Sequence, residues 1–135
     1  MNQPKAKITY LFHSGYMVET KDHLFIFDYY QPAPARGGKL ADGILTGEYL
    51  KTKSHVFVFA SHNHPDHYDP VILKWADCCP DITYILSSDI RVTAELPHFH
   101  IMSPYEEWEQ KGVRVKSFGS TDAGVSFLVQ ADRKS

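Results

Sequence analysis

The stretch from Ser61 to Pro70 constrains the fold and chemistry of this chain more than any other. It reads Ser-His-Asn-His-Pro-Asp-His-Tyr-Asp-Pro and directly follows the most strand-like run in the sequence, Val56 to Ala60. A strand that ends at Ala60 delivers the next residues to one rim of a sheet, where side chains can converge. Imidazole nitrogens and a carboxylate are ligands that borderline cations such as zinc accept. The stretch therefore predicts a metal site with four candidate ligands: His62, His64, Asp66 and His67.

The spacing of these residues favours two pairs of ligands. In an extended backbone, His62 and His64 project to the same side of the chain. Pro65 then turns the chain, so that Asp66 and His67 approach from another direction. Two such pairs suit two metal ions about 3.5 to 4 Å apart, the separation found in two-metal hydrolases. The alternative is a solvated polar loop in which the histidines cluster by chance.

The pattern His62-x-His64-x-Asp66-His67 after an apolar strand resembles the signature of the metallo-β-lactamase superfamily. The opening of the chain agrees, since Ile8 to Tyr16 reads Ile-Thr-Tyr-Leu-Phe-His-Ser-Gly-Tyr and Phe25-Ile26-Phe27-Asp28 follows. The sequence is similar to the branch that contains ascorbate-phosphate lactonase-like and other metal-dependent hydrolases, rather than to the antibiotic-degrading enzymes. The resemblance runs across nearly the whole chain and covers the N-terminal half of the family's fold.

This resemblance implies an α/β (α+β) fold, the αββα sandwich, of which residues 1–135 form a single domain with a mixed sheet and helices on one face. It implies one or two zinc ions, with manganese or iron as alternatives because these ligands do not select sharply among them. Asp66 would bind metal and orient the attacking water, which makes it the catalytic candidate. Asp28 would support the metal-binding loop without being a ligand. The alternative for Asp28 is that it caps a turn.

Two features leave the function open. His13, before Ser14-Gly15, either hydrogen-bonds the turn or lines the pocket. A complete site in the family also has a third histidine, a bridging aspartate and a final histidine, but Ser120 follows Gly119 where the third histidine often sits. The first hypothesis is therefore a metal-dependent hydrolase, incomplete in this chain, that acts on an ester, lactone or phosphodiester. The alternative is a catalytically silent metal-binding or assembly domain, the remnant or fragment of such an enzyme.

Composition narrows the partners and the location. The net charge of −2, from 14 basic and 16 acidic residues, gives no basic stripe for nucleic acid and favours a small-molecule substrate. No apolar run approaches the roughly 18 residues of a membrane span. The start of the chain lacks the apolar core of a signal peptide, so we expect the cytoplasm. Cys78 and Cys79 are adjacent and poorly placed to bridge each other, which favours buried thiols over a redox pair or ligands.

Periodicity gives the elements around the motif. An antiparallel meander is expected over 7–12, 16–20 and 24–27, followed by a long loop over 29–47 with a short helical turn at its end, and then the strand 55–60. A helix over 69–79 should cover a sheet face with Trp75 in the core. A strand at 82–86, a short helix ending near Glu95 and a hairpin of 113–118 with 125–129 complete the chain. His98 and His100 are expected on a surface or a strand.

Half of a sandwich has a consequence for assembly. A sheet whose inner face lacks its usual second sheet exposes an apolar patch and an unpaired edge, and both favour association. The sequence therefore predicts a homodimer or a complex with a second-half polypeptide.

Overall fold

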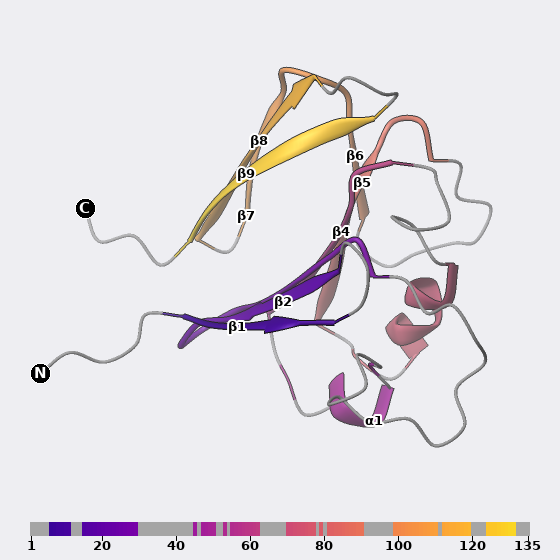
Figure 1. The fold of residues 1–135 in the computed structure, drawn as a ribbon, viewed down its shortest axis with the longest axis vertical. Coiled ribbons are helices and arrows are strands. Elements are labelled where there is room, and N and C mark those ends of the chain that lie inside the picture. The colour runs from indigo at the N-terminus through magenta and orange to yellow at the C-terminus, as the bar shows by residue number, and fades with distance from the viewer. Residues whose placement is uncertain are drawn as a thin grey trace, which may run out of the picture.

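The structure, a computed structural model, describes residues 6–11, 15–29, 45, 47–50, 53, 55–62, 70–77, 79, 81–90, 99–110, 112–119 and 124–131. These residues form two sheets, a six-stranded sheet in the order β1 to β6 and a three-stranded sheet in the order β7 to β9. The two sheets lie one above the other, and the helical segments lie on the far side of the larger sheet (Figure 1). This arrangement agrees with the expected sandwich, with helices on one face of a mixed sheet.

The larger sheet begins with the expected meander. Its strands are β1 (Lys7–Tyr10), β2 (Tyr16–Glu19), β3 (Leu24–Phe27), β4 (Val56–Ala60), β5 (Ile82–Ser87) and β6 (Phe99–Met102). Strands β1, β2 and β3 pair antiparallel, whereas β3 to β6 all pair parallel. Strands β3 and β4 are therefore direct neighbours in the sheet. Parallel pairing brings the carboxyl ends of four strands to one rim, the rim that the Ser61 loop leaves from.

Strand β4 is buried along its whole length because both of its faces are apolar. Val56, Val58 and Ala60 lie in the core cluster on the helix side, whereas Phe57 and Phe59 lie in the cluster between the two sheets. The alternation of side chains along a strand explains this division. The neighbouring strands follow the same rule, with β3 and β5 contributing to both clusters.

The helix side is covered by two short segments, α1 (Gly47–Leu50) and η2 (Pro70–Asp77). The expectation of an α-helix over 69–79 is wrong in helix type, because the described part of this segment is a 3₁₀ helix. The segment is short and bounded by Pro70 and Pro80, which donate no backbone hydrogen bonds, and 3₁₀ geometry is typical of such short pieces. Trp75 is buried as predicted. The Tyr84 hydroxyl donates a hydrogen bond of 2.6 Å to the Ile72 carbonyl, which ties η2 to the sheet.

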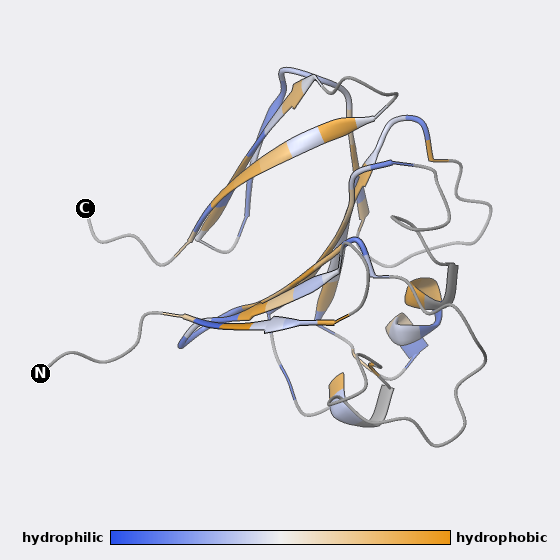
Figure 2. Cartoon of the chain, in the orientation of Figure 1, coloured by the Kyte–Doolittle hydropathy of each residue, from blue (hydrophilic) through white to orange (hydrophobic). Residues whose placement is uncertain are grey.

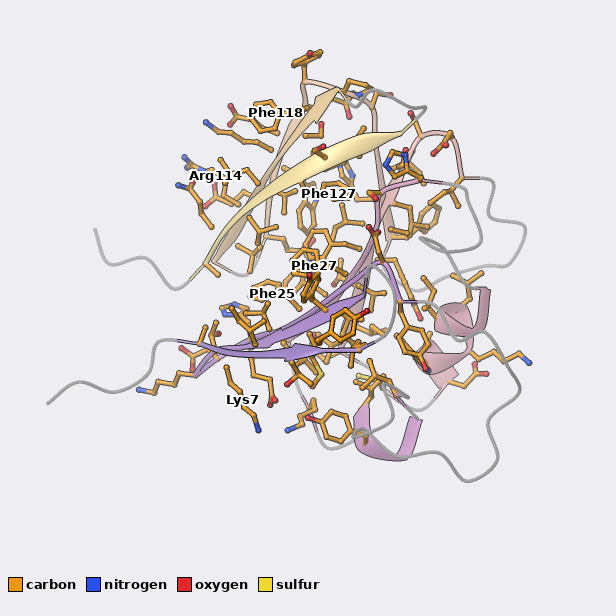
Figure 3. All side chains as sticks on the ribbon, viewed as in Figure 1. Lys7, Phe25, Phe27, Arg114, Phe118 and Phe127 are labelled. Atoms are coloured by element: carbon orange, nitrogen blue, oxygen red, sulfur yellow. The ribbon has the colours of Figure 1, made fainter. Side chains whose placement is uncertain are left out.

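The second sheet covers part of the inner face of the first. It consists of β7 (Glu107–Gln110), β8 (Val113–Gly119) and β9 (Val125–Ala131), all antiparallel. Figure 2 shows apolar colouring along β4 and much of β9. The side chains of Phe25, Phe27 and Phe127 lie in the space between the sheets (Figure 3). The ring of Phe127 meets that of Phe59 edge-on at 5.3 Å between centroids, so this layer packs as a sandwich core.

The sequence did not predict β6 or β7. Strand β6 has only four residues and follows a segment outside the described residues, where most of the expected helix ending near Glu95 also falls. Strand β7 reads Glu-Trp-Glu-Gln and carries a single apolar residue, so its pattern is that of a polar loop. Its register depends on Trp108, which packs on Phe57 from β4 and on His100 from β6. Tertiary contacts, rather than the local sequence pattern, therefore explain why these residues form a strand.

Two further features concern the edges of the core. Tyr29 is buried, meets Trp75 edge-on at 5.1 Å, and accepts a 3.0 Å hydrogen bond from the Leu45 backbone N–H at its hydroxyl oxygen. Cys79 is a buried free thiol, as expected, and Cys78 lies outside the described residues. In the described part of the chain, no helix is long and apolar enough to cross a membrane.

We predict that Phe59→Ala destabilises the protein by about 3 to 5 kcal/mol, because the ring is buried against three other aromatic rings in the inter-sheet core. Phe118→Ala is the matched control, since Phe118 is 41% exposed on the outer side of the second sheet. Urea unfolding followed by tryptophan fluorescence measures both. Equal losses in the two variants would show that the space between the sheets is not a packed core.

Candidate metal centre

The candidate site lies at the rim where the parallel strands end. Asp28 directly follows β3, and Ser61 and His62 directly follow β4. In open α/β sheets, ligands bind outside the carboxyl ends of the strands. Of the predicted site residues, Asp28 and His62 lie within the described part of the chain, and both are at this rim. His13, His64, Asp66 and His67 lie outside the described residues.

Asp28 fixes the first residue of the motif loop. Its carboxylate accepts two hydrogen bonds from Ser61, one from the backbone N–H to Oδ1 and one from the hydroxyl to Oδ2, each of 2.8 Å. Its own N–H donates to the Phe59 carbonyl at 2.8 Å, which extends the pairing of β3 and β4 by one residue. The backbone of Asp28 has a φ of 49°, a left-handed conformation that aspartate tolerates better than most residues. The two strands and the loop are thus joined at one carboxylate.

Strand β9 fixes the same residue from the opposite sheet. The Val125 N–H donates a 2.9 Å hydrogen bond to the Ser61 carbonyl. Gly124, which precedes it, has a φ of 107°, and a Cβ at this position would overlap the Ser61 carbonyl oxygen and Nδ1 of His62. The chain can approach the loop this closely only because residue 124 is glycine. The Nδ1 edge of the His62 ring is consequently turned toward β9.

Ser61 and Gly124 lie at the candidate site, and the sequence did not predict this position for either residue. Ser61 directly precedes the first histidine of the motif, and Asp28 ends the neighbouring strand. A hydroxyl donor and a carboxylate acceptor at two strand ends are a signal from which this hydrogen bond could have been predicted. The role of Gly124 depends on an approach between segments about 60 residues apart in the sequence, and no local pattern reports it.

The described residues contain no group of three histidine, cysteine, aspartate or glutamate side chains arranged to hold a metal ion. His62 is the only one of the four predicted ligands among them. The ligand set therefore stays a prediction. The structure places the first of these residues, His62, just after the end of β4. Ser61, which precedes it, forms hydrogen bonds with residues of both sheets.

A second histidine cluster lies at the opposite rim. His23 and His55 have ring centroids 5.6 Å apart, and Nδ1 of His55 is 2.9 Å from the Asp81 carboxylate. The two histidines line a cavity of about 360 Å³ together with Glu19, Thr20, Lys21, Asp22, Leu24 and Lys53. This cavity lies at the amino ends of β3 and β4, so it is separate from the rim of His62.

We predict that Asp28→Asn weakens zinc binding about 10- to 100-fold, the usual cost of losing an outer partner that orients a ligand loop. Asparagine tolerates the positive φ but presents one donor where Ser61 needs an acceptor. Asp22→Asn, in the exposed turn before β3, is the control and should leave affinity unchanged. Competition titration with a chromophoric chelator measures both. An unchanged zinc affinity in Asp28→Asn would show that this carboxylate does not support the metal site.

Gly124→Ala tests the contact from β9, and Gly112→Ala is its control because Gly112 also has a positive φ of 80° but has only one neighbour, a His23 atom at 4.0 Å. Both variants should lose about 1 to 3 kcal/mol of stability from the backbone strain. Only Gly124→Ala should also weaken zinc binding, because only there does the new methyl group displace His62. Denaturant unfolding and metal titration distinguish the two effects. Equal metal affinities would contradict the assignment.

No known family model matches the sequence, and no curated protein matches it. Solved structures do match. Igni18, a metallo hydrolase from Ignicoccus hospitalis, superposes with a TM-score of 0.63 at 16% identity, over 96% of this chain and 57% of its own. MEM-A1, a subclass B3 metallo-β-lactamase from a soil metagenome library, gives 0.52 at 15% identity, over 94% and 58%. CmlA, a diiron β-hydroxylase from Streptomyces venezuelae, gives 0.62 at 11% identity, over 98% and 29%.

These similarities confirm the expected fold. The chain spans a little over half the length of Igni18 and MEM-A1 and less than a third of CmlA. Identities this low establish the fold and leave the activity to be argued separately. The chain has the metallo-β-lactamase fold, and it corresponds to the N-terminal half of that fold.

Proposed function

We propose that this chain is a metal-dependent hydrolase domain in which His62, His64, Asp66 and His67 bind zinc, as one or two ions. The observation that carries the proposal is the position of His62 at the carboxyl rim, on a loop held by Asp28 and by β9. Imidazole and carboxylate donors suit zinc, and manganese and iron remain alternatives because the same donors accept them. The described similarity to a metallo hydrolase and to a β-lactamase supports a metal at this rim.

We assign a role in metal binding, in orienting water or in supporting the loop to each of these residues. A bound ion supplies Lewis acidity and lowers the pKa of water toward neutrality. His62, with its Nδ1 edge against Gly124, would present Nε2 to the ion. Asp66 would orient the attacking water toward an ester, lactone or phosphodiester centre. Asp28 would hold Ser61, and so the start of the ligand loop, through the two hydrogen bonds to its carboxylate.

A second candidate function is a catalytically silent metal-binding or assembly domain. One observation favours it: Ser120 stands where the family resemblance implies a third histidine. An ion held by His62 and His64 alone would have only two protein ligands, whereas catalytic zinc usually has three. Tight metal binding without turnover is the signature of this alternative.

We also propose a substrate class and a cellular location for the protein. The balanced charge supports a small-molecule substrate, and the absence of a disulfide framework in a sequence with two adjacent cysteines supports a cytoplasmic location. We also propose association, either as a homodimer or with a second-half polypeptide. The exposed apolar side chains on the first two strands support this part of the proposal.

We predict that the purified protein binds zinc, and that it hydrolyses a generic phosphodiester or lactone in a chelator-sensitive way. His64→Ala should abolish turnover and weaken metal binding by more than the roughly 10- to 100-fold typical of losing an outer partner. His55→Ala is the matched control, because this histidine lies at the opposite rim. Elemental analysis and a chromogenic hydrolysis assay measure both properties.

The possible results separate the two functions. Metal with turnover that His64→Ala removes supports the hydrolase, and metal without turnover supports the silent domain. A protein that takes up no zinc, manganese or iron contradicts both.

A further inference from the structure

The inner face of the larger sheet is only partly covered by the smaller sheet. Strand β7 lies over β4 to β6, since Trp108 meets Phe57 at 6.2 Å and His100 at 5.4 Å. Strand β9 lies over β4, since Phe127 meets Phe59 at 5.3 Å. The larger sheet has six strands and the smaller has three, so β1 and β2 extend beyond β9. The sandwich therefore has a step on one side.

The floor of this step is apolar. Ile8, Tyr10 and Tyr16 are 68%, 58% and 46% exposed, and the two tyrosine rings meet edge-on at 5.6 Å. Register places them on the inner face: Ile8 pairs with Val18, which packs against the inter-sheet cluster, and Tyr10 pairs with Tyr16. Figure 3 shows the preceding residue, Lys7, on the other side of the sheet, away from the smaller sheet. An exposed group of this kind favours association.

The edge above the floor is strand β9, and no other strand in the described part of the chain pairs with this edge. Strand β9 has seven residues, Val-Ser-Phe-Leu-Val-Gln-Ala, with no charge and no proline, and among the described strands it pairs only with β8. The opposite edge strand of the same sheet, β7, carries Glu107 and Glu109. Edge strands that remain solvent-exposed usually carry charges or proline. The composition of β9 is that of a strand that pairs on both sides.

Strand directions decide which occupant fits. Strand β1 runs parallel to β3 and β4, because two antiparallel pairings separate it from β3. Strand β9 begins next to Ser61, just after the end of β4, and its Phe127 reaches back to Phe59, so β9 runs antiparallel to β4 and to β1. A two-fold axis parallel to the strands and midway between the layers preserves these directions. It brings β1 of a second copy beside β9 in antiparallel orientation.

We propose that a second copy of this chain fills the step, with β1 of each copy pairing with β9 of the other. The two floors then face each other, and Ile8, Tyr10 and Tyr16 of both copies become buried. Each layer of the dimer continues from the smaller sheet of one copy into the larger sheet of the other. Pairing of β9 with β9 is excluded by the same geometry, because the β1 and β2 overhangs of the two copies would then occupy the same space.

This proposal deepens the association included in the proposed function and is independent of the metal. Light scattering after size exclusion should give twice the 15.4 kDa of one chain at micromolar concentrations. Ile8→Lys and Tyr10→Lys, each present twice in the symmetric interface, should raise the dissociation constant at least about tenfold, since a lysine would be buried without a partner. Leu128→Lys is the control, because Leu128 is on β9 but exposed on its outer face.

Hydrogen exchange of the unmodified protein provides a test without variants. Amides of β1 and β9 should exchange more slowly as the protein concentration rises, whereas those of β7 should not change. A monomer throughout the micromolar range overturns the proposal, and so does a dimer that Ile8→Lys and Tyr10→Lys leave intact. A different polypeptide held at this step in place of the second copy also overturns it. Metal content of the same samples is measured separately, so failure of the metal site and failure of the dimer are distinguished.

Discussion

Strand β4 is the element on which both the fold and the site depend. Its five residues are buried on both faces, with two valines and an alanine toward the helices and phenylalanines toward the second sheet. Burial of apolar side chains on two sides makes this strand central, and the loop that leaves it inherits a fixed starting point. A metal-binding loop on a mobile edge strand would have to be ordered each time an ion bound. Here the described start of the loop, Ser61 and His62, directly follows the buried strand.

One residue, Ser61, connects the packed core to the candidate site through hydrogen bonds. Ser61 uses its N–H and hydroxyl to bind Asp28 from the same sheet and its carbonyl to bind Val125 from the other sheet. Both sheets are therefore registered against each other at the residue just before the first predicted ligand. Preorganisation of this kind reduces the entropy lost when ligands converge on an ion. It also means that packing changes in either sheet reach Ser61 through hydrogen bonds, to the Asp28 carboxylate in one sheet and to the Val125 backbone in the other.

The sequence predicted the parts of this structure that local pattern encodes. The meander of β1 to β3 and the hairpin of β8 and β9 follow from alternating apolar residues and from turn glycines. It did not predict β7, because the single apolar residue of this strand, Trp108, is explained only by its packing against Phe57 and His100. It also gave the wrong helix type for residues 70–77, since two prolines and a short length outweigh helical periodicity. At the site, His62 and Asp28 were identified, whereas the contact of Gly124 depends on tertiary structure.

Tyr29 has a consequence for how such a domain can diversify. Its hydroxyl accepts the Leu45 N–H and its ring rests on Trp75, so two points of the backbone that are sixteen residues apart are joined through the core. Closing a longer connection costs only about 0.6 kcal/mol for each doubling of its length. A change in the number of residues between these two anchored points should therefore alter the stability of the core little.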